Sequence, residues 1–334
     1  MKISDWEGWK SGYYYYLSRQ KAFEKLHNET NHFIINTLKT GIYMQTLRNK
    51  ILTIDVNEHG AELTSIRKDG IEYLWQADPA FWKRRSPVLF PIVGSVWDGK
   101  FRVDGQEYAL SQHGFARDME FVLASRTEDS VTYRLESNEQ TLRKYPWPFR
   151  LEISYKLVGN EIVVGWMVRN TGDRQMFFQI GAHPAFYYPE YNKDKTDRGF
   201  LSFDRNNDLN CVRIVGKGCV DPINKHPLRI PEDGMLPLFS YTFDEIDTLM
   251  LQDSQIHHVT LHKQDRAPWI SLSFDAPVVG IWSPPGRNAP FICLEPWYGR
   301  ADRIAYKGEF KDRDWVNSLA PNTEFHATYR ITIH

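Results

Sequence analysis

The sequence has few cysteines, no long apolar run and no visible leader. Its 334 residues include three cysteines, Cys211, Cys219 and Cys293, and their spacings form no CxxC unit. An odd and scattered set argues against a disulfide framework and against a structural zinc site. No apolar stretch approaches the ~20 residues that cross a bilayer as a helix, and the first residues lack the apolar core of a secretory signal. We therefore expect a cytoplasmic protein with no membrane partner.

Net charge and the common nucleotide-binding motifs are also missing. The chain has 41 Lys and Arg residues against 42 Asp and Glu residues, so its net charge is -1. That balance exerts no bulk attraction on nucleic acid. The phosphate-binding patterns GxxxxGK(S/T) and GxGxxG are absent, as are the GxSxG and HExxH patterns. We therefore do not expect a nucleic-acid partner.

Strand patterns dominate the chain from residue 44 to its end. Residues 130–137 alternate apolar and polar side chains, which predicts a strand. Residues 151–158 and 162–168 are two further strand patterns joined by Gly159-Asn160, which predicts a hairpin. In residues 100–110, Asp104-Gly105 stands between two shorter strand patterns, which predicts a tight hairpin. Further strands are expected at residues 51–56, 61–67, 176–180, 248–251, 257–263, 269–274, 278–282, 291–294 and 325–333.

Helical patterns are few and short. They predict helices at residues 78–83 and at 138–145, where Pro146 ends the second. Without a strand–helix–strand rhythm a parallel α/β fold is disfavoured, and without an internal repeat so is a propeller. No low-complexity linker divides residues 44–334. We predict one large antiparallel all-β domain there, a sandwich or related stack, after an N-terminal extension of unknown role at residues 1–43.

Three segments place an ionisable side chain among aromatic residues, glycine and proline. They are residues 112–118 around His113, 181–186 around His183 and 293–299 around Glu295. His183 leaves an apolar strand pattern just before a proline, which suits the rim of a cleft. Glu295 follows another apolar strand pattern, and partial burial would raise its pKa toward the range of a general base. Taken singly, each segment is more often structural than catalytic.

Together the segments resemble the aldose 1-epimerase (galactose mutarotase-like) family, and within it the LacX-like branch. The resemblance extends from about Met44 to the C-terminus. It implies a large antiparallel β-supersandwich with few short helices and a sugar cleft on one face. It also implies an isomerase that interconverts the α and β anomers of a free aldose without a metal or an organic cofactor. The matching segments are SPVLFPIVG (86–94), HGFARD (113–118), GAHPAF (181–186), LEPW (294–297) and SLAP (318–321).

The resemblance also implies a role for each motif residue. Glu295 corresponds to the base that takes the proton of the C1 hydroxyl, and His183 to the acid that protonates the ring oxygen. His113 corresponds to a second catalytic histidine beside the sugar ring. The other expected substrate contacts are an arginine, taken as Arg85 with Arg84 as the alternative; Asp247; and Trp297, which either stacks on a sugar face or packs in the core.

Two alternative functions stay open beside this hypothesis. A non-catalytic sugar-binding or sensing protein would use the same cleft, but it would not need to keep both Glu295 and His183. The basic cluster at residues 83–85 is the only tight one near a motif, and it leaves open a mutarotase that acts on a hexose 6-phosphate. Neither the preferred sugar nor the oligomeric state follows from the sequence.

Two further patterns carry less weight. The family commonly has an arginine after the residue that corresponds to Gly94, whereas this chain has Ser95, so the identity of the substrate does not carry over. His257, His258 and His262 lie close together in a strand pattern. A zinc site there is disfavoured, because no cysteine and no supporting ligand pattern accompanies them.

Overall fold

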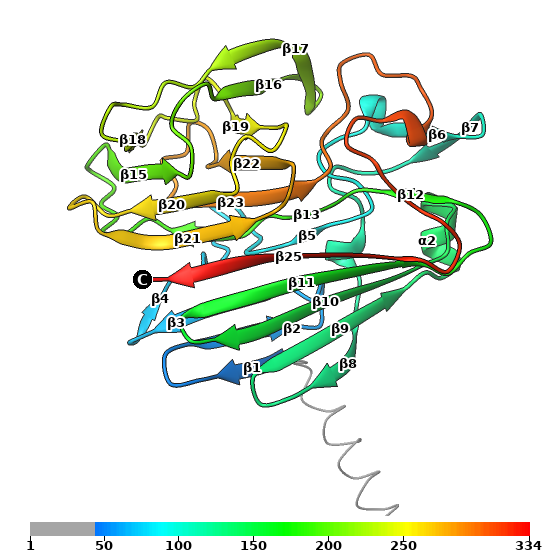
Figure 1. The fold of residues 1–334 in the computed structure, drawn as a ribbon, viewed down its shortest axis with the longest axis horizontal. Coiled ribbons are helices and arrows are strands. Elements are labelled where there is room, and N and C mark those ends of the chain that lie inside the picture. The colour runs from blue at the N-terminus through cyan, green and yellow to red at the C-terminus, as the bar shows by residue number, and fades with distance from the viewer. Residues whose placement is uncertain (1–43) are drawn as a thin grey trace, which may run out of the picture. The chain divides into compact units, whose positions relative to one another are not determined.

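The structure is a computed structural model that describes residues 44–334 (Figure 1). The predicted N-terminal extension, residues 1–43, lies outside the described residues. Within residues 44–334 almost all regular structure is antiparallel β-strand, so the predicted all-β supersandwich fold with few short helices is confirmed. No helix in this part of the chain is long and apolar enough to cross a membrane. The helical elements are α2 (Glu139–Lys144) and the 3-10 turns η1 (Trp97–Gly99), η2 (Ala116–Asp118) and η3 (Phe310–Asp312).

The first large sheet has nine strands and contains the longest alternating sequences. Along β11, apolar side chains at every second position are buried, from Ile162 to Val168, because successive side chains of a strand point to opposite faces. β10 and β11 pair along their full length around Gly159, which confirms the predicted hairpin. The strands in spatial order are β18 (Leu236–Phe239), β15 (Asp197–Phe203), β20 (His258–His262), β21 (Pro268–Phe274), β25 (Glu324–Ile333), β11 (Glu161–Asn170), β10 (Phe149–Val158), β9 (Ser130–Glu136) and β8 (Val122–Arg126).

The second large sheet has eight strands, and β23 lies in its interior. Nearly every residue of β23 is buried, as expected for a strand that begins with the apolar run at residues 291–294. Side chains of both large sheets, such as Ile153 from the first and Leu294 from the second, share one hydrophobic core. The strands are β17 (Cys219–Pro227), β16 (Asn210–Gly216), β19 (Thr248–Leu251), β22 (Val278–Trp282), β23 (Phe291–Tyr298), β13 (Ile180–Ala182) and β5 (Val88–Leu89), with β14 (Ala185–Tyr187) also paired to β23.

Three smaller sheets complete the described domain. In the β6–β7 hairpin Asp104 and Gly105 have φ angles of 52° and 79°, the left-handed pair that a tight turn needs, so this prediction is confirmed. The small sheets are β1 (Met44–Arg48), β2 (Thr53–Asn57), β3 (Leu63–Lys68) and β4 (Ile71–Glu72); β6 (Lys100–Val103) and β7 (Gln106–Ala109); and β12 (Met176–Phe178) with β24 (Asn317–Leu319).

One of the two predicted helices is wrong. At residues 78–83 the chain makes a turn instead, in which the backbone N–H groups of Phe81 and Trp82 both donate to the carbonyl of Asp78 at 3.0 Å. The segment is too short to propagate a helix on its own, and its aromatic side chains Phe81 and Trp82 pack against one buried cluster that contains Trp75 and Phe291. The other prediction is confirmed as α2, whose first turn is capped by the side chain of Asn138.

Candidate active site

Glu295 lies in the middle of β23, opposite Gly280 of the neighbouring strand β22. Its side chain is 1% exposed. Burial raises the pKa of this carboxyl group well above its ordinary value, and the negative charge of Asp247 adds to the rise, while the side chain of Trp297 opposes it. A carboxyl group in these surroundings favours its neutral, protonated form.

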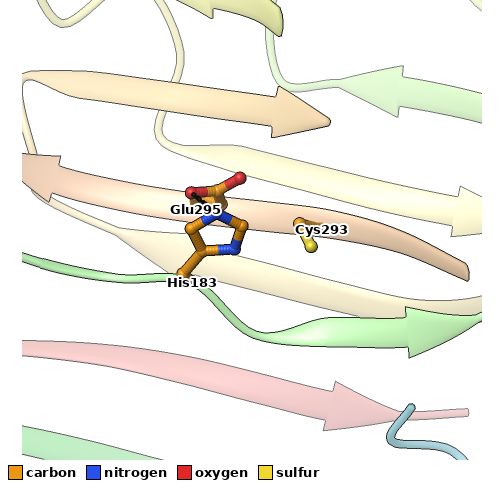
Figure 2. Close-up of side chains that lie close together, drawn as sticks. All are labelled: His183, Cys293 and Glu295. Atoms are coloured by element: carbon orange, nitrogen blue, oxygen red, sulfur yellow. Dashed lines mark ion pairs between the residues drawn. The ribbon is translucent and has the colours of Figure 1, made fainter. Parts of the chain in front are cut away.

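The register of two short strands places His183 beside Glu295. β13 pairs Gly181 with Trp297, and β14 pairs Ala185 with Cys293, so position 183 between them faces position 295. As a result, two residues that are distant in the sequence meet in space. The Nε2 atom of His183 lies 3.3 Å from the Oε2 atom of Glu295 (Figure 2).

Two tryptophans enclose the His183 ring. The ring stacks on Trp82, with the centroids 4.7 Å apart, and meets Trp282 edge-on at 5.6 Å. Burial lowers the pKa of His183 to about 3, and the positive charge of Arg117 acts in the same direction. Burial therefore disfavours a charge on either member of the His183–Glu295 pair, and a neutral pair holds one transferable proton.

The pair is not fully hydrogen-bonded. The separation of 3.3 Å is long for a hydrogen bond. Within residues 44–334, Nδ1 of His183 and Oε2 of Glu295 are buried and have no hydrogen-bond partner. Because almost all buried polar atoms in proteins are paired, each exception calls for an explanation. Here the unpaired atoms mark a place where a ligand's polar groups would fit.

His113 completes the group from an unusual backbone conformation. Its φ angle is 66°, and a Cβ atom on the next residue, Gly114, would lie 2.2 Å from the carbonyl oxygen of Phe90. The N–H of Gly94 donates to Nδ1 of His113 at 3.1 Å, so the ring proton of the neutral side chain is on Nε2. Burial lowers the pKa of His113 well below its ordinary value, followed by the effect of His183, whose ring centroid lies 5.5 Å away.

A cleft of about 230 Å³ opens over these side chains. Asp247 lines it from a position with a φ angle of 57°, and its Oδ1 accepts a hydrogen bond from the hydroxyl of Thr248 at 2.7 Å. The cleft thus brings together five of the six predicted site residues. Four of them are polar, and the fifth is the apolar Trp297. The ionisable lining of the cleft consists of His113, Arg117, His183, Asp247 and Glu295.

The arginine that lines the cleft is Arg117, whereas neither Arg85 nor Arg84 does. Arg85 donates to the carbonyl of Gln76 at 3.5 Å, and Arg84 forms an ion pair with Asp118 at 2.9 Å. The side chain of Arg117 is 14% exposed, and burial lowers its pKa to about 10. Arg117 belongs to the HGFARD segment, so its place in a motif was the signal that could have identified it.

Trp297 is held in a narrow slot beneath the cleft. A Cβ atom on Gly181 would lie 2.6 Å from its ring, and one on Gly280 would lie 2.5 Å from it. The indole N–H donates to the carbonyl of Ala182 at 3.2 Å, and the side chain is 5% exposed. Of the two interpretations of Trp297, this arrangement agrees with packing in the core. It leaves little of the ring face free to stack on a sugar.

Trp82 and Trp282 are site residues that the sequence analysis missed. Both line the cleft and both are half-buried, with their rings 5.7 Å apart. Trp82 is fixed by its own backbone, because the indole N–H of Trp75 donates to the Trp82 carbonyl at 2.7 Å. Trp82 lies in the turn that was predicted to be helical. A helix there gave no reason to expect that its ring would face a cleft.

The described residues contain one group of side chains with metal-ligand geometry. One ligand atom from each of His183, Cys293 and Glu295 lies within 4.8 Å of the others (Figure 2). The histidines considered from the sequence are engaged elsewhere: Nε2 of His258 bonds to the hydroxyl of Thr260 at 3.0 Å, and Nδ1 of His262 to the carbonyl of Arg266 at 2.9 Å.

Comparison with known proteins identifies one family along nearly the whole described chain. A family model described as "Aldose 1-epimerase" matches residues 43–332. A curated relative, the plasmid-encoded protein LacX of Lactococcus lactis subsp. lactis, is 32% identical over 296 residues, which are 86% of this chain and 98% of the relative.

Solved structures agree with that match. A galactose mutarotase related enzyme from Lactobacillus acidophilus has a TM-score of 0.79 and 32% identity, covering 87% of this chain and 97% of that one. A galactose mutarotase-like protein from Lactobacillus casei has a TM-score of 0.79 and 30% identity, covering 87% of this chain and 100% of that one.

Proposed function

The chain belongs to the aldose 1-epimerase family, and from this premise we propose that it interconverts the α and β anomers of a free aldohexose in the cleft over Glu295 and His183. The observation that carries the proposal is the pair itself. A carboxyl group and an imidazole lie 3.3 Å apart, each with a buried atom that no other described group satisfies. They line a cleft that also offers an arginine, an aspartate and a second histidine.

Anomer exchange needs one base and one acid that then exchange roles. The proton of the C1 hydroxyl leaves, the ring oxygen gains a proton, and the C1–O5 bond breaks to give the aldehyde. Rotation about C1–C2 and reclosure on the other face return both protons. A pair that carries one transferable proton suits this cycle, because it accepts one proton and donates one in each half and ends unchanged.

We assign Glu295 as the base for the C1 hydroxyl and His183 as the acid for the ring oxygen. In the neutral pair, which burial favours, the shared proton is on Glu295. In the ion pair, which this assignment requires, the same proton is on His183. Moving the proton between them spans the 3.3 Å between Nε2 and Oε2. A sugar hydroxyl that donates to Glu295 and a ring oxygen that accepts from His183 both favour the charged form.

The remaining polar groups hold and polarise the sugar. His113 presents an Nε2–H donor, because its Nδ1 is already engaged by Gly94. Arg117 takes the place that we expected for Arg85 and donates to sugar oxygens, while Asp247 accepts from sugar hydroxyls. All three line the cleft. Charged partners form the stronger hydrogen bonds and fix the orientation of the ring.

The cleft's size and walls favour a monosaccharide. Its volume of about 230 Å³ is below the ~300–1,000 Å³ of pockets for drug-sized ligands. Trp82 and Trp282 provide aromatic faces for the apolar side of a sugar, with Trp297 as a packed floor. The basic cluster at residues 83–85 does not line the cleft, so it offers no support for a 6-phosphate there.

Polarimetry of freshly dissolved α-glucose and α-galactose tests this function. We expect the protein to speed the approach to anomeric equilibrium above the spontaneous rate, with glucose 6-phosphate measured in parallel. Calorimetric sugar binding without any acceleration would replace the proposal with the sugar-binding alternative. Acceleration with the phosphate sugar alone would replace it with the 6-phosphate alternative.

A further inference from the structure

Next to the catalytic pair lies a group that the proposed reaction does not use, the thiol of Cys293. Cys293 is a free, buried cysteine on β23, two positions before Glu295, so the two side chains leave the same face of the strand. Together with His183 they form the group whose ligand atoms lie within 4.8 Å of one another (Figure 2). Imidazole, carboxylate and thiolate are the three ligand types of protein zinc sites.

The spacing of two of these atoms already corresponds to metal coordination. Two ligand atoms that each lie ~2.0–2.1 Å from a tetrahedral zinc ion are about 3.3 Å apart. Nε2 of His183 and Oε2 of Glu295 are separated by 3.3 Å. Oε2 has no hydrogen-bond partner among the described residues, so an ion there displaces no protein hydrogen bond from it.

The third ligand needs only a small movement, and the fourth position faces the cleft. A thiolate ~2.3 Å from the same ion would lie about 3.6 Å from the imidazole nitrogen. The sulfur of Cys293 starts within 4.8 Å of a ring nitrogen of His183 and of a carboxylate oxygen of Glu295, so closing a gap of about 1 Å brings it to coordinating distance. His183 and Glu295 both line the cleft, through which an ion reaches the gap between them.

We propose that His183, Glu295 and Cys293 form an inhibitory site for a thiophilic divalent cation of the Zn²⁺ class. A ligand set with a thiolate selects such ions over Mg²⁺ and Ca²⁺, which prefer oxygen ligands. The bound ion takes the lone pairs that Glu295 and His183 would use for proton transfer, so anomer exchange stops. Binding stands on the geometry alone, whereas inhibition rests on the proposed function.

Titration of the full chain with Cd²⁺ tests binding without reference to activity. Cadmium–thiolate bonds give an ultraviolet charge-transfer absorption, which we expect to saturate at one equivalent. It is lost in Cys293→Ser and in Cys293→Ala, and it is retained in Cys211→Ser, a matched control because Cys211 is also free and buried. The site is overturned if the folded wild type shows no such absorption, or if it persists in a folded Cys293 variant.

Zinc inhibition tests the second part of the proposal, that the bound ion stops anomer exchange. Zn²⁺ should suppress anomer exchange by the wild type, and a chelator should restore it. Relative to its own zinc-free rate, Cys293→Ser should need at least ~10-fold more Zn²⁺, since even a supporting residue of a metal site is worth 10–100-fold in affinity. Equal sensitivity of the two proteins overturns the inhibitory role. Cadmium absorption without any anomer exchange would refute the proposed function and support the metal site. Anomer exchange without the absorption would support the function and refute the metal site.

Discussion

Two buried charged clusters in this domain are built in opposite ways. In the first, Nε of Arg313 donates to Asp302 at 2.6 Å, and both side chains are at most 3% exposed. The other Arg313 nitrogens donate to the Gln179 side chain and the Arg300 carbonyl, at 3.0 and 3.3 Å. The second Asp302 oxygen accepts from the Trp97 backbone N–H at 2.8 Å. This cluster joins η1 and the segment after η3 to the residues that precede β13 and follow β23.

The His183–Glu295 pair is also buried, with side chains 10% and 1% exposed, but each member keeps an unpaired polar atom. A buried network that is fully satisfied rigidifies a fold, whereas one that is partly satisfied costs stability. The contrast supports the proposal that the His183–Glu295 pair serves chemistry, whereas the Arg313–Asp302 cluster serves the fold. Hydrogen-bond satisfaction distinguishes the two, while burial alone does not.

Replacing both members of the His183–Glu295 pair has the largest expected effect. His183→Asn should lower the exchange rate by ~10²–10⁴-fold, the usual value of general acid–base catalysis. Combining it with Glu295→Gln should cost little more, since groups that act as a unit are strongly non-additive. Exchange NMR measures the rates, and urea unfolding should show no loss of stability. Losses that multiply in the double variant would mean that the two residues act independently.

The Arg313–Asp302 cluster should respond in the opposite way. Arg313→Met leaves Asp302 buried without its partner, so we expect the free energy of unfolding to fall by ~3–5 kcal/mol. The molecules that remain folded should keep an exchange rate near that of the wild type. Arg143→Met, which removes an exposed ion pair with Glu139, is the control and should change stability little. An unchanged unfolding curve for Arg313→Met would refute the structural role.

The pH dependence sharpens the same comparison. Burial lowers the pKa of His183 to about 3 and raises that of Glu295 well above its ordinary value. The pair therefore gains a second proton only as the pH falls through about 3, and it keeps its single proton to a pH well above the ordinary range of a carboxyl group. We expect kcat/KM, measured by polarimetry, to be flat from roughly pH 5 to 8, whereas a solvated pair would lose its proton above a pH of ~6.5. A decline centred near that value would show that the pair is hydrated in the free protein.

Removing residues 1–43 has the smallest expected effect. Both clusters lie within the described residues 44–334, and the family match covers residues 43–332. The truncated chain should keep the wild-type rate of anomer exchange and a cooperative unfolding transition. An insoluble or molten product would place the extension in the core.

Local patterns in the sequence predicted what depends on local spacing. Two strand patterns joined by Gly159-Asn160 predicted the β10–β11 hairpin, because a two-residue turn with glycine pairs the strands that flank it. The motifs around His183 and Glu295 pointed to residues that the β13, β14 and β23 register does bring together. The catalytic roles of these residues remain predictions.

What the sequence could not predict depends on side-chain direction after folding. Arg85 adjoins one motif and Arg117 lies within another, yet only Arg117 lines the cleft. The role of Trp82 in lining the cleft was not predicted, because the short helical spacing of residues 78–83 indicated a helix where the chain forms a turn. The proximity of Cys293 to His183 arises from strand pairing between distant segments, which no local pattern encodes.

Glu295→Gln tests the central claim most directly, because it keeps the shape of the side chain and removes the proton acceptor. Anomer exchange by NMR and sugar affinity by calorimetry are measured together on the wild type and this variant. We expect exchange to fall by ~10²–10⁴-fold, while His113, Arg117 and Asp247 retain the sugar with affinity near that of the wild type. Exchange at the full wild-type rate in folded Glu295→Gln would contradict the assignment of the buried pair as the catalytic acid and base.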